Sequence, residues 1–294
     1  MKRTKITVLL FGLLMTALLA GCSQKGQDSS QNTKTEGLDQ LGEIQVVSRE
    51  EGSGTRNVFA EIVGFLENNE GKPDLTTDKA QIAENADKVC ELVSENKSAI
   101  GYVSLGTVPE GKNIKVLKVN GSEASLEEKK YPLSRTFYLA YSGRLSELEQ
   151  DFLSYVHGAG QELVAESYIP VAKSSSFLSN KANGTLTIGG STSVAPLIAN
   201  LATAYMKINS NAKIVVQSSD SSDGLTKAMS GEFDFGMSSR DLKDYEMELL
   251  DYEAIAEDDI AIIVNAENPL EDITLEELKN VFTGKFVKWE ELNQ

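Results

Sequence analysis

Residues 44–59 read IQVVSREEGSGTRNVF: a strand-like run, then a Gly/Ser loop, then the start of a helix. Apolar residues continue at helical spacing over residues 58–66. The same order returns at residues 185–205, where TLTI is followed by GGSTS and a helical pattern with Pro196 in its first turn. Strands that alternate with helices in this way predict an α/β fold.

The rest of the chain continues this alternation. Apolar runs predict further strands at residues 99–103, 114–119, 136–141, 213–216, 233–235 and 260–264. Helical spacing predicts helices near residues 86–95 and 145–156, and the capping box Thr274-Leu-Glu-Glu277 predicts another helix start. Residues 173–184 are small and polar, so we expect them to link two halves of the chain.

Composition and charge limit the possible functions. The chain has 294 residues, of which 40% are hydrophobic, as in an ordinary globular protein. Its 44 acidic and 28 basic residues give a formal net charge of −16, so we expect no nucleic-acid partner, because such binding needs a basic face. Two cysteines and one histidine argue against a zinc cluster or a disulfide framework, and we expect no metal and no cofactor. Cys90 lies on an apolar helical face and is expected to be a reduced core residue.

The first residues resemble the leader of a bacterial lipoprotein. Lys2, Arg3 and Lys5 precede an apolar run over residues 6–19, which ends in Leu-Ala-Gly-Cys22. The resemblance implies a signal peptide over residues 1–21 and lipidation of Cys22; an ordinary signal peptide with a chance cysteine is the alternative. Residues 22–42 then predict a flexible tether, because residues 23–40 contain a single large apolar residue, Leu38.

Three Gly/Ser/Thr loops each follow a predicted strand and open a predicted helix. They lie at residues 49–56, 189–193 and 217–224, and Arg49 leads the first of them. A helix N-terminus presents unpaired N–H groups and a positive dipole end, glycine allows close approach, and hydroxyls add donors. One such loop is most often only a helix cap, but three in one chain favour a small oxyanion held between several helix ends.

The usual enzyme signatures do not fit these loops. The sequence has no nucleotide-binding GxxxxGK[ST] pattern. A serine hydrolase needs a histidine base, and the single histidine, His157, follows a predicted helix in a sequence without a Gly-x-Ser-x-Gly elbow. We therefore expect no catalytic residues.

Several ordered segments resemble the phosphate-binding proteins of bacterial phosphate ABC importers. These segments are REEGSGT at 49–55, IGGSTSV at 188–194, FDFGMSSR at 233–240, VFTGKFVKW at 281–289, AIGYVS at 99–104 and YPLSR at 131–135. The resemblance implies a two-lobed type II periplasmic-binding-protein fold with a hinge between the lobes. One lobe would combine residues 43–130 with 258–294, and the other would hold residues 131–257.

The order of the segments departs from the family. There the Gly-Ser-Thr-Ser half comes first, whereas here the Arg-x-x-Gly-Ser-Gly-Thr half comes first and each half occurs once. The simplest interpretation is a circular permutation, with the family's ends joined near residues 174–184. It predicts that the start of the folded part, near Ile44, and Gln294 lie close together in one lobe. A half-swapped dimer, in which another copy completes each site, is the rival interpretation.

The resemblance implies a phosphate site with no metal. We expect eight residues to bind phosphate: Arg49, Ser53, Gly54, Thr55, Thr192, Ser193, Ser221 and Ser239. Glu50 or Glu51 is a candidate to orient Arg49, Arg56 is expected at the surface, and contact by Arg240 is left open. Some family members place an aspartate at the position of Ser239, so the acceptor for the phosphate proton stays open among a serine hydroxyl, Asp220, Asp223 and a backbone carbonyl.

The implied function is that of a lipid-anchored binding protein at the outer face of the bacterial cytoplasmic membrane. It would capture inorganic phosphate and deliver it to the permease subunits of an ABC importer, with the lipid at Cys22 as its contact with the membrane. Three alternatives stay open: a phosphate sensor or scaffold without transport, a binder of another oxyanion such as sulfate or molybdate, and a secreted phosphatase on the same scaffold.

Overall fold

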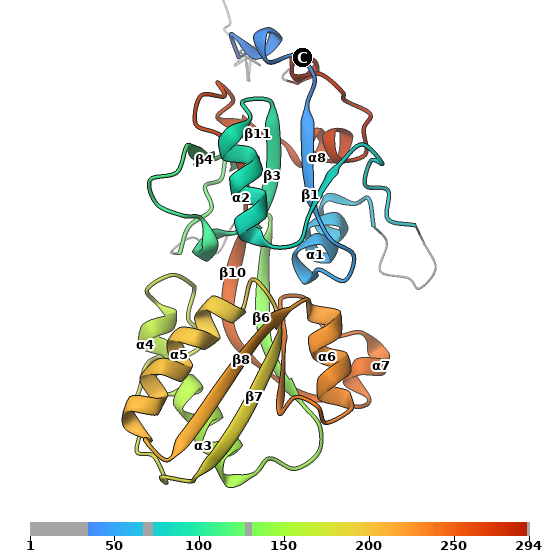
Figure 1. Ribbon diagram of the computed structural model, residues 1–294. Helices are drawn as coiled ribbons and strands as arrows, with labels where there is room; N and C mark the ends of the chain where they lie inside the picture. Colours follow the sequence, from blue (N-terminus) through green and yellow to red (C-terminus); the bar gives the residue numbers. More distant parts are fainter. Residues whose placement is uncertain (1–34, 67–72, 127–130, 293–294) are drawn as a thin grey trace, which may run out of the picture. The chain divides into compact units, whose positions relative to one another are not determined.

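The computed structural model describes residues 35–66, 73–126 and 131–292, all within one compact unit, Lys34–Gln294. The predicted signal peptide, Cys22 and most of the predicted tether lie outside the described residues. Two lobes share a path of hydrogen-bonded strands in the order β2-β1-β3-β10-β6-β9-β7-β8, and β4 also pairs with β10 (Figure 1).

The first lobe, called here the α1 lobe, holds the strands before β6 together with the last helices of the chain. Parallel strands β1 and β2, and β1 and β3, lie side by side, and β3 is antiparallel to the C-terminal part of β10. Its elements are η1 (Leu38–Leu41), β1 (Gln45–Arg49), α1 (Gly54–Val63), β2 (Gln81–Ala83), α2 (Ala86–Glu95), β3 (Ala99–Ser104), η2 (Leu105–Thr107), β4 (Ile114–Val116), β5 (Lys118–Val119), β11 (Asp272–Ile273), α8 (Leu275–Phe282) and η3 (Trp289–Glu291).

The second lobe, called here the α5 lobe, holds the middle of the chain. Strand β7 is parallel to both β8 and β9, and β9 is antiparallel to β6. Its elements are β6 (Ser134–Tyr141), α3 (Glu147–His157), α4 (Gln161–Val164), β7 (Gly184–Ser191), α5 (Ala195–Ile208), β8 (Ala212–Ser219), α6 (Ser221–Met229), β9 (Phe235–Ser238) and α7 (Asp244–Met247).

Strand β10 (Asp251–Asn265) runs from one lobe into the other (Figure 1). Its residues 251–259 pair with β6, and its residues 260–264 pair with β3. The hydrophobic cores divide at the same place, because Ile255 packs with the α5 lobe and Ile260 with the α1 lobe. The sequence predicts only residues 260–264 as a strand, since the first half of β10 is polar and owes its extended form to β6.

Most predicted elements are found, with two differences. The capping box at Thr274 and Glu277 starts α8, as predicted. The predicted strand at 114–119 is broken into β4 and β5, because β4 pairs with β10 whereas β5 pairs with β11. The strand predicted at 233–235 begins only at Phe235 and runs to Ser238, fully buried beside β6 and β7.

Two expectations about single segments need comment. Leu38 is buried at 1% exposure within the 3-10 turn η1, so the predicted tether extends too far: its last residues pack on the core. Residues 173–183 carry no helix or strand, but the carboxylate of Asp151 accepts hydrogen bonds from Ser179 Oγ (2.6 Å) and Asn180 N (2.8 Å). The predicted linker is therefore an irregular segment anchored to α3.

The start of the folded part and the segment around Trp289 meet in the α1 lobe. Ile44 N donates to the carbonyl of Val287 (2.9 Å), and Trp289 N donates to the carbonyl of Gly42 (3.1 Å). Figure 1 shows the last described part of the chain, in red, beside the start of β1. Gln294 itself lies outside the described residues.

Cys90 is confirmed as a core residue. Its side chain is fully buried on α2 among Val89, Val93 and Ala261. Burial raises the pKa of the Cys90 thiol to about 11. The thiol is therefore protonated at neutral pH, and a protonated, buried thiol is unreactive.

Candidate anion-binding site

The Arg49 loop joins the end of β1 to the start of α1. Ser53 caps the helix, and its hydroxyl accepts from Arg56 N. Gly52 has φ +89°, and a Cβ there would lie 2.8 Å from Asp220 Oδ1. Only glycine combines this backbone angle with so close an approach to the opposite lobe.

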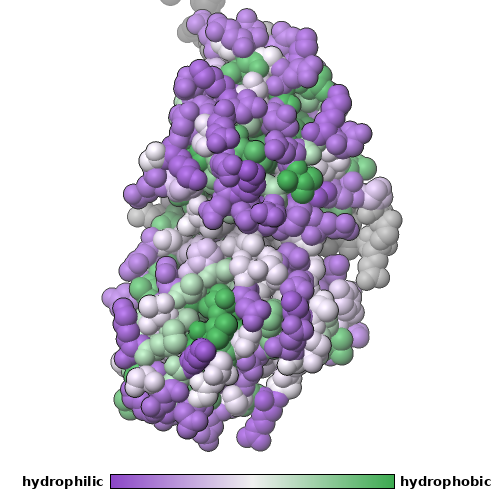
Figure 2. Space-filling model, in the orientation of Figure 1, coloured by the Kyte–Doolittle hydropathy of each residue, from purple (hydrophilic) through white to green (hydrophobic). Residues whose placement is uncertain are grey.

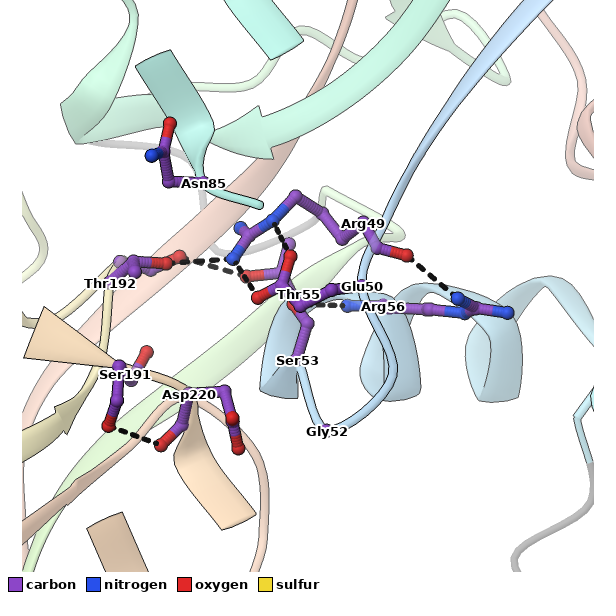
Figure 3. A network of polar contacts seen from close by, with 12 residues as sticks. Arg49, Glu50, Gly52, Ser53, Thr55, Arg56, Asn85, Ser191, Thr192 and Asp220 are labelled. Carbon is purple, nitrogen blue, oxygen red and sulfur yellow. Dashed lines mark hydrogen bonds and ion pairs between the residues drawn. The ribbon is translucent and has the colours of Figure 1, made fainter. Parts of the chain in front are cut away.

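The Arg49 side chain is buried and held by two partners (Figure 3). Its Nε and Nη2 donate to the two carboxylate oxygens of Glu50, at 2.8 and 2.7 Å. Nη2 also donates to Thr192 Oγ1 of the α5 lobe at 2.8 Å. The Nη1 atom is buried without a hydrogen-bond partner among the described residues. Glu50, one of the two carboxylates considered from the sequence, is thus the group that orients Arg49.

The start of α1 lies directly against the α5 lobe. Thr55 Oγ1 and Ser193 Oγ are 2.9 Å apart. A Cβ on Gly54 would lie 2.4 Å from Ser221 Oγ and 2.6 Å from Ser239 Oγ. The structure therefore brings the predicted site residues of both lobes together within a single chain.

The hydroxyls of the α5 lobe form their own network. Ser191 Oγ donates to Ser239 Oγ at 2.9 Å, and Ser239 N donates to Ser221 Oγ at 3.2 Å. All three serines are buried. They stand at the ends of β7 and β9 and at the start of α6, where backbone N–H groups and hydroxyls can face one anion.

Arg135 is a site neighbour whose role the sequence analysis missed. It lies at the start of β6, and its Nη1 donates to Thr55 Oγ1 at 2.6 Å. Its Nε and Nη2 lie 2.9 and 2.8 Å from Asp258 Oδ2. Burial raises the pKa of Asp258, and the ion pair with Arg135 opposes that shift. The available signal was an arginine at the start of an apolar strand, within the YPLSR segment.

The two other arginines near the site, Arg56 and Arg240, are held by partners within the fold. Arg56, expected at the surface, is instead 16% exposed at its side chain: Nη1 donates to the Arg49 carbonyl (2.7 Å) and Nε to Asp74 Oδ2 (2.7 Å). Its first-turn position points it back along the loop, so it braces Arg49. Arg240 pairs with Glu246 at 2.7 Å and touches the site region through Ser222 Oγ (3.3 Å).

Acidic side chains surround the approach to these loops. A cavity of about 800 Å³ is lined by residues of both lobes, including Glu50, Glu84, Asp87, Thr192 and Asp220. On the face shown in Figure 2 the α1 lobe is covered mainly by hydrophilic side chains. Of the two aspartates considered as proton acceptors, Asp220 lies against Gly52, whereas Asp223 pairs with Lys227 at 3.1 Å.

Within the described ranges, no three His, Cys, Asp or Glu side chains are grouped so as to hold a metal ion. No helix among these residues is both long and apolar enough to span a bilayer. His157 lies in the last turn of α3, with Nε2 3.8 Å from a carboxylate oxygen of Glu253, far along the chain from the three loops.

Comparison with known proteins agrees with this geometry. The family model of the PBP superfamily domain matches residues 27–159 and 175–294. Phosphate-binding protein PstS 2 of Streptococcus agalactiae is 36% identical over 100% of both chains, and that of Streptococcus pneumoniae is 37% identical over 98% of both. A crystal structure of a phosphate ABC transporter phosphate-binding protein from Streptococcus pneumoniae superposes with a TM-score of 0.71 at 38% identity, covering 85% of this chain and 100% of that one.

The two-lobed architecture, the converging Gly/Ser/Thr loops and the similarity over the full length thus lead to the same assignment. The chain belongs to the PBP superfamily and, within it, to the phosphate-binding proteins of bacterial phosphate ABC transporters.

Proposed function

We propose that this protein captures inorganic phosphate between the α1 and α5 lobes, at the eight residues expected from the sequence. The observation that carries the proposal is the Arg49 guanidinium, whose Nη1 is buried without a partner while its Nη2 reaches Thr192 in the opposite lobe. A buried donor without an acceptor costs about 1–3 kcal/mol, and a bound anion would remove that cost.

The surrounding groups suit a desolvated tetrahedral anion. Phosphate that leaves water needs a donor for every oxygen. Arg49, the hydroxyls of Ser53, Thr55, Thr192, Ser193, Ser221 and Ser239, and the N–H groups at the start of α1, including Gly54, would supply these donors. The direct Thr55–Ser193 contact is where we expect an anion oxygen to enter between the lobes.

Selectivity against sulfate needs an acceptor for the phosphate proton. Ser239 is a hydroxyl, and it already accepts from Ser191. Asp220 is the carboxylate beside the Arg49 loop, so we propose it as the first candidate acceptor; preference for sulfate or molybdate is the alternative outcome.

We further propose that the protein is lipid-anchored at Cys22 on the outer face of the cytoplasmic membrane and delivers phosphate to ABC permease subunits. The relatives' names support the transport role, and the sequence around Cys22 supports the anchor. A sensor without transport would bind phosphate equally well but would not stimulate a permease. We propose a binding protein and not a phosphatase. An assay that detects no phosphoester hydrolysis would support this proposal.

The permuted order of the halves remains our interpretation. Contacts between Ile44 and Val287 support it, because they bring the two ends of the folded part together. The streptococcal relatives match along their whole length, so we propose that they share this order. Convergence of both halves in one chain favours a monomeric site over a half-swapped dimer.

Isothermal titration of the full chain, in mild detergent, with phosphate, sulfate and molybdate tests the proposal. Tight phosphate binding is expected, with a loss of about 100-fold in Arg49→Ala, because charge-assisted hydrogen bonds contribute about 1.5–3 kcal/mol each. Arg144→Ala removes an exposed arginine and serves as the matched control. Equal affinities in the two variants would contradict the proposed site.

A further inference from the structure

Arg135 occupies an unusual place, at the crossing between the lobes. It stands opposite Asp258 in the pairing of β6 with β10, and both side chains are only 1% exposed. Ser104 Oγ donates to the other carboxylate oxygen of Asp258 (2.8 Å), and the guanidinium lies 5.0 Å from the centre of the Phe137 ring. The position of the Arg135 side chain is therefore fixed from several sides.

The bond from Arg135 to Thr55 determines what the Thr55 hydroxyl can do. A guanidinium has no acceptor, so in the 2.6 Å contact Nη1 donates and Thr55 Oγ1 accepts. The hydroxyl hydrogen of Thr55 must then point elsewhere, and Ser193 Oγ lies 2.9 Å away across the lobes. Nη1 also lies 3.4 Å from the carbonyl oxygen of Ser239, so the same atom touches both lobes.

This inference rests on the proposed phosphate site. We propose that Arg135 is a positioning residue that makes Thr55 a hydrogen-bond donor toward the anion. The site would therefore favour the more ionised form of phosphate. With one lone pair taken by Arg135, the Thr55 hydroxyl is favoured as a donor, and a donor bonds an unprotonated phosphate oxygen more strongly than a protonated one.

The charged and titratable groups that face Arg135 are few. Asp258 pairs with it directly, Arg49 lies on the anion side, and Tyr168 packs near Phe137 and Asp258. Burial raises the pKa of Tyr168, so its hydroxyl is neutral in the tested range. Burial raises the pKa of Asp258, so the variant that replaces Asp258 is also the one that removes its titration, and phosphate loses its second proton between about pH 5 and about pH 8.

The test is a mutant cycle read by titration calorimetry of the full chain with inorganic phosphate. Thr55→Val removes the hydroxyl but keeps the shape of the side chain. Arg135→Gln combined with Asp258→Asn removes the buried charge pair together, which avoids an unpaired buried carboxylate. We expect Thr55→Val and the double variant each to lower the affinity for phosphate about tenfold. The three substitutions together should lower it little further, because the charge pair and the Thr55 side chain act through the same hydroxyl.

The pH profile separates positioning from a merely structural role. Wild-type affinity is expected to rise from about pH 5 to about pH 8, as phosphate loses its second proton. The rise should flatten in the Arg135→Gln, Asp258→Asn variant and be partly regained in Arg135→Lys. Unfolding temperatures without phosphate verify folding, and Arg144→Gln is the matched control.

Two results would overturn the inference while leaving the proposed function intact. In the first, the affinity losses of Thr55→Val and of the Arg135→Gln, Asp258→Asn variant multiply when the substitutions are combined. In the second, the affinity of the Arg135→Gln, Asp258→Asn variant rises with pH as steeply as that of the wild type. If the wild-type chain binds sulfate or molybdate instead, the cycle is repeated with that anion, and multiplying losses again overturn the role of Arg135. If it binds none of them, the proposed function fails and the inference fails with it.

Discussion

Of the two lobes, the α1 lobe brings charge to the cleft, whereas the α5 lobe brings hydroxyls. Arg49 and its partner Glu50 both belong to the α1 lobe. The α5 lobe presents Thr192, Ser193 and the serine network, while its two buried arginines are each paired with a carboxylate, Arg240 with Glu246 and Arg135 with Asp258. The difference teaches where the charge is balanced: the Arg49 ion pair lies within one lobe, so a separation of the lobes would leave it intact.

At Gly54 the start of α1 lies directly against the α5 lobe, and Gly54→Ala should disrupt this contact between the lobes. The added methyl would overlap Ser221 Oγ and Ser239 Oγ, at 2.4 and 2.6 Å, and would hold the lobes apart. We expect phosphate affinity to fall by more than about 100-fold, while the helix itself keeps or gains stability because alanine is a better helix former. Calorimetry and thermal unfolding without ligand measure both effects. Unchanged affinity would show that the lobes do not close on α1.

A single hydroxyl of the α5 lobe should matter less than the charge of the α1 lobe. Ser221→Ala removes one buried hydroxyl at the start of α6, and we expect a loss of about tenfold in phosphate affinity. Ser230→Ala, at the exposed end of the same helix, is the matched control. A loss as large as that of Arg49→Ala would remove the asymmetry between the lobes.

In the α5 lobe, the charge of the buried Arg240 is neutralised by the carboxylate of Glu246. Burial raises the pKa of Glu246, but hydrogen bonds from Arg240 and the Lys243 backbone outweigh it, and the net pKa is lowered. Its ionised form therefore stabilises the fold above about pH 4.5, and this contribution disappears as the pH falls through the lowered pKa. Glu246→Gln should lower the free energy of unfolding by about 1.5–3 kcal/mol at neutral pH, because it removes the charge from hydrogen bonds with Arg240, with affinity changed less than in Ser221→Ala.

Urea unfolding of wild type and Glu246→Gln at several pH values measures this difference. It should shrink as the pH falls from about 4.5, the ordinary pKa of a glutamate, through the lowered pKa of the native carboxylate. A constant difference at all pH values would mean that packing, and not the ion pair, supports Arg240.

Sequence reasoning found the site because its parts are local. A strand, a Gly/Ser loop and a helix start are read from adjacent residues, and REEGSGT, GGSTS and the Ser221 loop do converge. Their roles in phosphate binding remain predictions. The cap at Thr274 and the buried Cys90 were likewise visible in short windows.

The features that were not predicted from the sequence depend on residues that are distant along the chain. The polar half of β10 is extended because β6 lies beside it. Arg135 reaches Thr55 across 80 positions, and no local pattern predicts that contact. Arg56 was placed wrongly at the surface because its partner Asp74 lies 18 residues away. Leu38 was assigned to the tether because its segment is otherwise polar, but a single apolar residue beside a hydrophobic core can pack against that core.

The pairing of Arg49 with Glu50 also has a kinetic consequence. A neutralised guanidinium projects little field into solvent, and the chain around it carries a net charge of −16. A phosphate ion therefore approaches against a weak repulsion and is attracted only at contact distance. Added salt should then speed the encounter, in contrast to proteins that steer their anions with exposed positive charge.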